Sequence, residues 1–360
     1  MRILVAAGSS GGHIFPAVSF LEALKERYAQ AQALLVLPER SRKRGITVNN
    51  LKVKYISICP LKPSLSRVFL FVLRQFIKGS LESLFILIKF EPDIVVGFGG
   101  LECVPLVSFA WFFRIKTLIH EQNVIPGKAN RLLSKFVDKT AISFEETRNY
   151  LRVSQDSVVF TGNPVRKELR IKRDRLDALN FFGFDEEKFN VLVMGGSQGS
   201  HKINACFLKV ISALTDKSKI QVIHISGSRD YALLSDSYKG INIKVKLFSF
   251  LSQMQCAYSA CDLVISRAGA TTISELIYFG VPAILVPYPF ASKHQAANAR
   301  VLEKIGSAIV IDEGQLEAVA LKDMLSEFIN NPDKLKAMRS RYDCVSRISA
   351  HEALVNAVME

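Results

Sequence analysis

Two glycine-rich turns, each preceded by a short apolar run, most constrain what this chain can fold into. The first turn comprises residues 8–13 (Gly-Ser-Ser-Gly-Gly-His) and the second residues 195–199 (Gly-Gly-Ser-Gln-Gly). A buried strand that ends in glycines and continues into a helix is how α/β folds build anion sites, because backbone N–H groups and the helix dipole then face the phosphate. Two such turns, about half a chain apart, predict two nucleotide-type domains with a ligand site between them.

Neither turn matches a standard nucleotide motif. Both depart from the G-x-G-x-x-G fingerprint of dinucleotide-binding domains, and neither is followed by the Gly-Lys-Ser/Thr of a P-loop. For each turn taken alone, an ordinary tight turn therefore stays open as the alternative.

Short apolar runs alternate with helical patterns along the whole chain. This alternation is typical of parallel sheets covered by helices on both faces, so the predicted fold class is α/β. A charged stretch follows Gly-Asn-Pro-Val-Arg at 162–166, and we expect an N-terminal domain over 1–163, a C-terminal domain over 164–340 and a final helix within 341–360 that packs back on the N-terminal domain. The predicted strands are residues 2–6, 33–37, 94–97, 116–120, 139–142, 157–160, 190–194, 220–225, 244–247, 263–266, 283–286 and 308–311.

The chain carries a large excess of positive charge. Its 47 lysine and arginine residues against 33 acidic residues give a net charge of +14 over 360 residues. Such an excess suits nucleic acid, an anionic membrane surface or a phosphorylated substrate. The sequence has no zinc-binding Cys/His spacing, RNA-binding aromatic signature or basic tail, so it favours a membrane surface or a phosphate substrate over nucleic acid.

The cysteines and the start of the chain bear on the compartment. Six cysteines are scattered through the sequence, mostly in apolar surroundings, and the chain opens directly on a predicted strand. We interpret the cysteines as reduced thiols and expect the protein to stay in the cytoplasm.

Residues 69–90 form the most apolar stretch of the sequence. Charged residues and a glycine interrupt it, so it lacks the run of about 20 apolar residues that a membrane span needs. The pattern predicts one or two amphipathic helices, which either cover the sheet or also meet lipid with one face. The candidate membrane patch consists of Phe69, Leu73, Arg74, Phe76, Ile77 and Lys78.

Four further clusters of glycine or polar residues follow predicted strands. They are residues 97–100 (Gly-Phe-Gly-Gly), 120–123 (His-Glu-Gln-Asn), 267–275 and 294–295 (His-Gln). Polar residues at the carboxyl ends of parallel strands are where open α/β sheets bind ligands. Glu275 lies one turn inside a predicted helix, where a carboxylate can bind the diol of a ribose; the alternative is an acid that merely stabilises the helix start.

Together these segments resemble the MurG family of UDP-N-acetylglucosamine transferases of peptidoglycan synthesis, and the resemblance runs nearly from end to end. Its most specific part is His-Glu-Gln-Asn at 120–123 with the continuation Pro-Gly-Lys-Ala-Asn-Arg at 126–131. The other matching segments are residues 8–16, 97–100, 162–166, 195–199, 267–275 and 294–299.

The resemblance implies the GT-B architecture, in which two Rossmann-like domains with parallel sheets face a central cleft. It implies an inverting transfer of N-acetylglucosamine (GlcNAc) from UDP-GlcNAc to the muramyl 4-hydroxyl of lipid I, the undecaprenyl-diphospho-muramoylpentapeptide, which gives lipid II. The implied partners are these two substrates and an anionic membrane surface, without nucleic acid, metal or cofactor. The implied location is peripheral, on the cytoplasmic face of the plasma membrane.

The family pattern also implies roles for individual residues. Ser197 and Arg166 would stabilise the leaving UDP, Glu275 would hold its ribose, Leu251 would lie by the uracil and Gln295 would bind GlcNAc hydroxyls. The full donor site would comprise Ser10, Gly11, Gly12, Asn123, Arg166, Ser197, Leu251, Ala270, Thr271, Thr272, Ile273, Ser274, Glu275 and Gln295. His13 is the candidate base, since a histidine can take a proton near neutral pH; the alternative is that it positions an acceptor phosphate.

Three other functions stay open beside this one. They are a GT-B transferase that acts on another membrane lipid, a UDP-GlcNAc epimerase of similar architecture, and a nucleotide-sugar binding module without activity. The segment at 120–123 argues against the first. An epimerase would not need a basic surface near lipid, and a binding module would need only one of the two half-sites.

Overall fold

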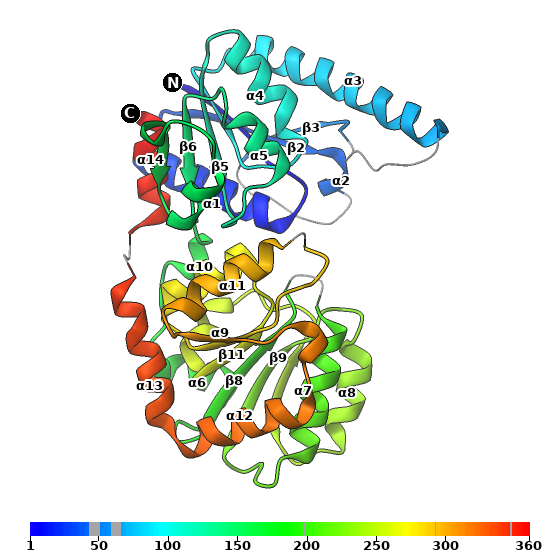
Figure 1. The fold of residues 1–360 in the computed structure, drawn as a ribbon, viewed down its shortest axis with the longest axis vertical. Coiled ribbons are helices and arrows are strands. Elements are labelled where there is room, and N and C mark those ends of the chain that lie inside the picture. The colour runs from blue at the N-terminus through cyan, green and yellow to red at the C-terminus, as the bar shows by residue number, and fades with distance from the viewer. Residues whose placement is uncertain (43–50, 59–65, 197–198, 292, 346–347) are drawn as a thin grey trace. The chain divides into compact units, whose positions relative to one another are not determined.

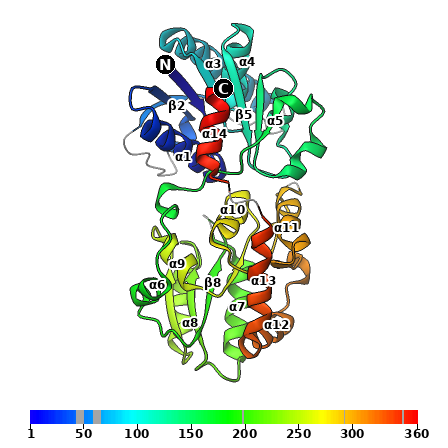
Figure 2. The same ribbon diagram turned by 90° about the vertical axis from the view of Figure 1, so that its left-hand side faces the viewer.

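The computed structural model describes residues 1–42, 51–58, 66–196, 199–291, 293–345 and 348–360, and of residues 66–72 the backbone alone. The chain divides into two compact units (Figures 1 and 2). Unit 1 comprises Met1–Arg166 together with Ile348–Glu360, and unit 2 comprises Lys167–Arg347. The chain therefore leaves unit 1 and returns to it at its C-terminal end.

Unit 1 is built on a seven-stranded parallel sheet. Its strands are β1 (Arg2–Ala6), β2 (Gln32–Pro38), β3 (Lys52–Ile56), β4 (Ile94–Gly97), β5 (Lys116–Glu121), β6 (Lys139–Ile142) and β7 (Val158–Phe160). They are ordered β3-β2-β1-β4-β5-β6-β7. The order reverses between β1 and β4, and such a switch point opens a ligand site at the carboxyl ends of the two strands.

Helices cover both faces of this sheet (Figure 1). On β1, Ile3 and Val5 pack in a cluster with α1 (Gly11–Arg27) and the C-terminal helix, whereas Leu4 and Ala6 pack in a second cluster with α3 (Ser66–Phe90) and α4 (Cys103–Phe112). Because both faces are buried, the strand is an unbroken apolar run instead of an alternating one. The helices of unit 1 are α1 (Gly11–Arg27), α2 (Glu39–Arg42), α3 (Ser66–Phe90), α4 (Cys103–Phe112), α5 (Lys128–Leu133) and α14 (Ala350–Met359).

Unit 2 repeats this plan on a six-stranded parallel sheet. Its strands are β8 (Phe189–Met194), β9 (Ile220–Ile225), β10 (Lys244–Phe248), β11 (Leu263–Ser266), β12 (Ala283–Leu285) and β13 (Ala308–Val310), ordered β10-β9-β8-β11-β12-β13. The switch point lies between β8 and β11. The helices are α6 (Arg175–Phe182), α7 (His201–Ala213), α8 (Tyr231–Lys239), α9 (Met254–Ala260), α10 (Ala270–Phe279), α11 (His294–Lys304), α12 (Ala318–Asn330) and α13 (Pro332–Ser340).

The C-terminal helix α14 belongs to unit 1 and packs along α1 (Figure 2). Leu354 and Val358 are fully buried in the cluster that α1 also enters. The Arg27 guanidinium donates to the Asn356 side chain, and Lys139 Nζ donates to the Ala357 carbonyl at 3.2 Å. Residues Arg341–Cys344 form a short 3-10 turn in unit 2, so the helix itself starts only at Ala350.

The predicted α/β class is confirmed, and each predicted strand overlaps an observed one. Strand β3 was not among the predicted strands. Its sequence Lys-Val-Lys-Tyr-Ile alternates charged and apolar residues, which is typical of a half-exposed edge strand, and β3 indeed pairs with β2 at the edge of the sheet. The predicted strands are continuous apolar runs, and an edge strand with alternating residues contains no such run.

The apolar stretch at 69–90 lies in one 25-residue helix, α3, and not in two. Among the residues that the structure describes, no helix combines the length and the hydropathy that crossing a bilayer requires.

Candidate functional site

The glycine turns after β1 and β4 pack directly on each other in unit 1. The Gly8 N–H donates to the Gly99 carbonyl at 2.9 Å. A Cβ at Gly100 would lie 2.8 Å from the Gly8 Cα, a distance that real side chains do not reach, and Gly100 has a φ of +88°. The backbone can make this approach only because both turns lack side chains.

His13 lies in the first turn of α1, beside these glycines. Its Nδ1 is 3.2 Å from the Ser10 Oγ, and a Cβ built on Gly8 would lie 2.5 Å from the same Nδ1. Ser10 is the N-cap of α1 but makes no capping hydrogen bond with its side chain. The N-terminus of α1 at Gly11 and Gly12 thus lacks a side-chain cap, which suits an anion or a sugar hydroxyl.

Glu121 organises the loop that follows β5. One carboxylate oxygen accepts from the Asn123 N–H at 2.9 Å and from its side-chain amide at 3.2 Å. The other accepts from the Gly127 N–H at 3.0 Å and from Asn130 Nδ2 at 2.8 Å. These four bonds to a buried carboxylate explain the pattern Glu-Gln-Asn followed by Pro-Gly-Lys-Ala-Asn: much of the motif shapes its own loop.

His120 is fully buried beneath this loop and is neutral. Its Nε2 lies 3.0 Å from the Gly162 carbonyl, which can only accept, so Nε2 carries the proton. Its Nδ1 therefore accepts from Gln122 Nε2 at 3.0 Å. Burial disfavours the charged imidazolium and lowers the pKa of His120 from 6.5 to about 4. His120 thus holds the Gly162 carbonyl and the Gln122 side chain in place.

Arg166 is the last residue of the first segment of unit 1, and its side chain lies near the first glycine turn. Its guanidinium lies 5.3 Å from the centre of the Phe15 ring. The same ring is in contact with Gly11, where a Cβ would lie 3.0 Å from it. Arg166, Gly11 and His13 therefore lie together at the N-terminal end of α1.

The glycine turn of unit 2 joins β8 to α7. Gly196 and Gly199 have φ values of +82° and +75°, and a Cβ at Gly195 would lie 2.1 Å from the Ser200 N–H nitrogen. Only glycine fits such a turn. The predicted diphosphate contact Ser197 lies outside the described residues.

The segment after β11 leads into α10 without a side-chain cap. Its N-cap is Gly269, and Ala270, Thr271 and Thr272 form the first helical turn. Glu275 lies one turn further on and is 6% exposed; its carboxylate accepts from the Tyr258 hydroxyl at 2.7 Å. The sequence did not single out Tyr258, because a tyrosine among the apolar residues of α9 carries no pattern of its own.

Two amide side chains of α11 hold the backbone just before α10. Gln295 Oε1 accepts from the Ala268 N–H at 3.3 Å and from the Tyr288 N–H at 2.9 Å. Asn298, fully buried, donates to the Ala268 carbonyl at 3.3 Å. The Gln295 oxygen therefore holds two backbone N–H groups in place, whether or not the side chain also makes the predicted sugar contact.

Arg267 and Leu251, two further residues of the predicted segments of unit 2, are both buried. Arg267 is buried and binds the Val286 and Pro287 carbonyls and the Glu313 carboxylate, so it fixes the loop after β12. Leu251, 4% exposed, follows β10 at the same edge of the sheet as Glu275. Within unit 2 the structure thus brings Leu251, residues 270–275 and Gln295 to the carboxyl edge, and within unit 1 Ser10, Gly11, Gly12, His13, Asn123 and Arg166.

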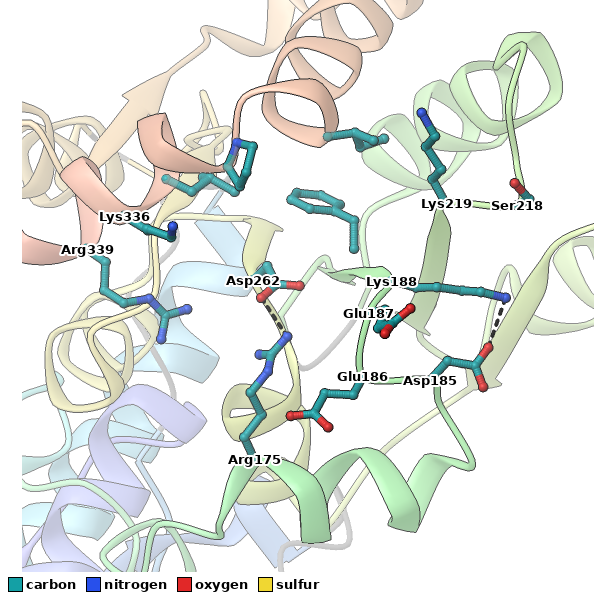
Figure 3. Close-up of a pocket in the computed structure, with 14 residues that line it drawn as sticks. Arg175, Asp185, Glu186, Glu187, Lys188, Ser218, Lys219, Asp262, Lys336 and Arg339 are labelled. Atoms are coloured by element: carbon teal, nitrogen blue, oxygen red, sulfur yellow. Dashed lines mark ion pairs between the residues drawn. The ribbon is translucent and has the colours of Figure 1, made fainter.

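A cavity of about 960 Å³ lies at the opposite, amino edge of the unit 2 sheet (Figure 3). Its charged side chains largely neutralise one another: Arg175 pairs with Asp262 at 2.8 Å and Lys188 with Asp185 at 2.9 Å. None of the predicted donor residues lines it. The described residues also include no group of three or more His, Cys, Asp or Glu placed to hold a metal ion.

Comparison with known proteins decides the family. The glycosyltransferase family 28 N-terminal domain matches residues 3–142 and the family 28 C-terminal domain matches residues 190–353. A protein of Desulforamulus reducens named UDP-N-acetylglucosamine--N-acetylmuramyl-(pentapeptide) pyrophosphoryl-undecaprenol N-acetylglucosamine transferase is 35% identical, over 99% of this chain and 98% of its own. The chain belongs to the MurG family of glycosyltransferase family 28. A Caldanaerobacter subterraneus protein of the same name is 38% identical over 97% of both chains.

Solved structures of other proteins share the fold of this MurG family member. The structure of Acinetobacter baumannii MurG has a TM-score of 0.77 at 23% identity and covers 100% of this chain and 99% of that one. A Neisseria meningitidis UDP-GlcNAc 2-epimerase bound to UDP-GlcNAc has a TM-score of 0.69 at 16% identity, with 100% of both chains covered. The expected GT-B-type pair of parallel-sheet domains is confirmed.

The buried imidazole of His120 predicts a pH dependence of stability. Its folded pKa of about 4 lies below the value of 6.5 for an exposed histidine, so below pH 6.5 the unfolded chain binds a proton that the folded chain does not. Unit 1 should lose about 1.4 kcal/mol of stability for each pH unit between 6.5 and 4, with no such loss above pH 6.5. Urea unfolding followed by the fluorescence of Trp111, the single tryptophan and a residue of unit 1, measures this.

The control for this prediction is His120→Gln, which removes the titrating group. The variant should be less stable at pH 7, but its stability should fall less steeply from pH 6.5 to 5 than that of the wild type. Equal slopes in the two proteins would show that another group causes the loss.

Proposed function

We propose that this chain transfers GlcNAc from UDP-GlcNAc to the lipid-linked muramyl-pentapeptide diphosphate, as the names of its relatives state for them. The observation that carries the proposal is the carboxyl edge of the unit 2 sheet. There a glycine turn, an uncapped helix N-terminus and the buried carboxylate of Glu275 stand together. These are the groups that a diphosphate, a sugar and a ribose require.

The donor is held mainly by unit 2 in this proposal. Leu251 lies by the uracil, Glu275 binds the ribose hydroxyls, and the turn at Gly195–Gly199 with Ser197 receives the diphosphate. The first turn of α10, from Ala270 to Ser274, and Gln295 bind the GlcNAc. Unit 1 adds Arg166 for the diphosphate and Ser10, Gly11, Gly12 and Asn123 at its own carboxyl edge.

The chemistry has two electrostatic demands. The muramyl 4-hydroxyl oxygen attacks the anomeric carbon, and the bond from that carbon to the diphosphate oxygen breaks with inversion. The hydroxyl proton passes to His13, whose imidazole stands at the N-terminus of α1 beside the glycines. The negative charge that appears on UDP is stabilised by the N–H groups at the start of α7 and by the guanidinium of Arg166.

A transfer assay with His13→Asn tests both the activity and the base. Wild-type protein given labelled UDP-GlcNAc and a lipid I analogue should form a labelled disaccharide lipid. Asparagine keeps a hydrogen-bonding group but cannot take the proton, so kcat should fall about 10²- to 10⁴-fold while the Kd for UDP stays within about twofold. An N-acetylmannosamine product would indicate an epimerase, and near-normal kcat in His13→Asn would make His13 a positioning residue.

If Glu275 binds the ribose, its substitution should remove the preference for UDP over UDP that lacks the 2′ and 3′ hydroxyls. Glu275→Gln keeps the size of the side chain but removes a charged acceptor, so UDP should bind about 10- to 100-fold more weakly. UDP that lacks the 2′ and 3′ hydroxyls should bind equally to the wild type and the variant. Glu186→Gln, an exposed acid at the amino edge of the same sheet, is the control and should change neither affinity.

We further propose that unit 1 docks on an anionic membrane through α3 and the end of α4. Ile77, Leu81, Phe85 and Ile88 are 53%, 62%, 65% and 61% exposed and recur at helical spacing along one face of α3. The rings at Trp111–Phe113, at the end of α4, are also exposed, and α4 packs on α3. Phe76 of the candidate patch packs against the core instead, and nothing is described of the Phe69 side chain.

Basic residues accompany this apolar stripe. Arg74, Lys78, Lys89 and Arg114 are exposed on the same two helices or directly after them. Apolar insertion and attraction to anionic lipid therefore act together, with about 1 kcal/mol for each basic residue near the surface. This proposal places the protein on the cytoplasmic face of the membrane, where its lipid-linked acceptor is embedded, and it involves no nucleic acid.

Vesicle co-sedimentation measures this docking. Phe85→Ser with Ile88→Ser should reduce binding to phosphatidylglycerol vesicles at least tenfold, and raised salt should weaken wild-type binding. Trp111 fluorescence should shift to shorter wavelength when the wild type binds. Ile171→Ser with Phe181→Ser, two exposed apolar residues of unit 2, should leave binding unchanged; equal losses in both double variants would contradict the assignment.

A further inference from the structure

A buried chain of polar side chains lies beneath the glycine turn of unit 2. The Tyr238 hydroxyl is 2.8 Å from His224 Nδ1, and His224 Nε2 is 3.0 Å from Asn204 Oδ1. Asn204 Nδ2 then donates to the Ser226 carbonyl at 2.9 Å and to Asp230 Oδ2 at 2.8 Å. Asn204 and His224 are 1% and 0% exposed, so both side chains are shielded from bulk solvent.

The direction of every bond in this chain is fixed. Asn204 Nδ2 faces a carbonyl and a carboxylate, which only accept, so its Oδ1 must be the acceptor for His224. His224 Nε2 therefore carries the proton, and Nδ1 accepts from Tyr238. Burial lowers the pKa of His224 to about 3, so the ring stays neutral at pH 7 and carries only this one proton. These hydrogen bonds run from Tyr238 on α8 through His224 on β9 to Asn204 on α7, and they fix the orientation of the Asn204 amide.

The chain ends at the backbone of the glycine turn. The Ser226 carbonyl that Asn204 holds is packed on Gly199, where a Cβ would lie only 2.2 Å from the carbonyl oxygen. Asn204 also donates its own N–H to the Ser200 carbonyl at 2.9 Å, in the first turn of α7. The Asn204 side chain thus ties the loop after β9, whose Ser226 carbonyl packs on Gly199, to the start of α7.

We propose that Tyr238, His224 and Asn204 are positioning residues for the leaving diphosphate. They do not touch the donor; they hold the Ser226 carbonyl and, through it, set Gly199 and the N–H groups at the start of α7. An N–H group stabilises developing charge only if it is already aimed at the phosphate oxygen. This inference rests on the proposed function, since it takes the turn as the diphosphate site.

The test compares two ligands that differ only in the diphosphate. In Tyr238→Phe, His224 Nδ1 loses its donor, and the turn is held less firmly. We expect UDP to bind about three- to tenfold more weakly, while uridine binds with unchanged Kd. Asn204→Ala, which removes the bond to Ser226 directly, should produce a larger loss for UDP and again none for uridine. Isothermal titration calorimetry of the full-length protein measures both.

A matched control lies on the same strand. Gln221, fully buried near the amino end of β9, binds the Asp185 backbone at 2.9 Å through both its oxygen and its nitrogen, and Asn190 Oδ1 at 3.0 Å. Gln221→Leu should destabilise unit 2 as much as Tyr238→Phe or more, yet leave both affinities unchanged.

The outcomes separate the two proposals. If wild-type protein binds UDP but Tyr238→Phe and Asn204→Ala bind it normally, or weaken UDP and uridine alike, the positioning role is overturned and the proposed function stands. If Gln221→Leu weakens UDP as selectively as Tyr238→Phe, general destabilisation explains the effect and the positioning role is again overturned. If the wild type binds no UDP, the proposed function falls and the positioning role falls with it.

Discussion

In both units the shape of the candidate site depends on a close contact between two main-chain segments. Each contact lies at the carboxyl ends of neighbouring central strands. In unit 1 Gly8 meets Gly99 and Gly100, and in unit 2 Gly199 meets the Ser226 carbonyl. A single methyl group at Gly100 or at Gly199 would collide with this neighbouring main chain and push the turns apart. The turns lie at the switch points of the two sheets, so this close approach determines where helix N-termini and N–H groups point. The polar residues around the turns then hold a geometry that the glycines permit.

The polar residues of the family motifs divide their work between structure and ligand. Glu121 uses both carboxylate oxygens within its own loop, and Gln295 uses its oxygen on two backbone N–H groups. His120 and Arg267 are buried and hold carbonyl groups. The residues left for chemistry are fewer, and several of them stand at the starts of α1 and α10, which have no side-chain cap. A motif that is specific for a family is therefore not a list of ligand contacts; much of it preserves the shape of a loop.

The sequence predicts most of the fold because buried parallel strands are continuous apolar runs, and it predicts the place of the site because the glycine turns follow those runs. It misses the edge strand β3, whose alternating Lys-Val-Lys-Tyr-Ile has no such run. It also misses Tyr258, Asn204 and His224, since pairs of buried polar groups from distant elements leave no local pattern. On α3 it places the membrane patch near the start of the helix, whereas exposure continues to Ile88, because which face is buried depends on packing against unit 1.

The return of α14 to unit 1 has a consequence for biosynthesis. Unit 2 has all of its residues once Arg347 has emerged from the ribosome, but the face of α1 that receives Leu354 and Val358 stays uncovered until α14 has emerged as well. The first unit to be translated is thus the last to complete its core. Until then the apolar residues of α1 that pack against α14 are exposed, and such transiently exposed apolar surface makes a partly folded chain prone to aggregation. A deletion that removes α14 would therefore uncover α1, which lies more than 300 residues earlier in the chain.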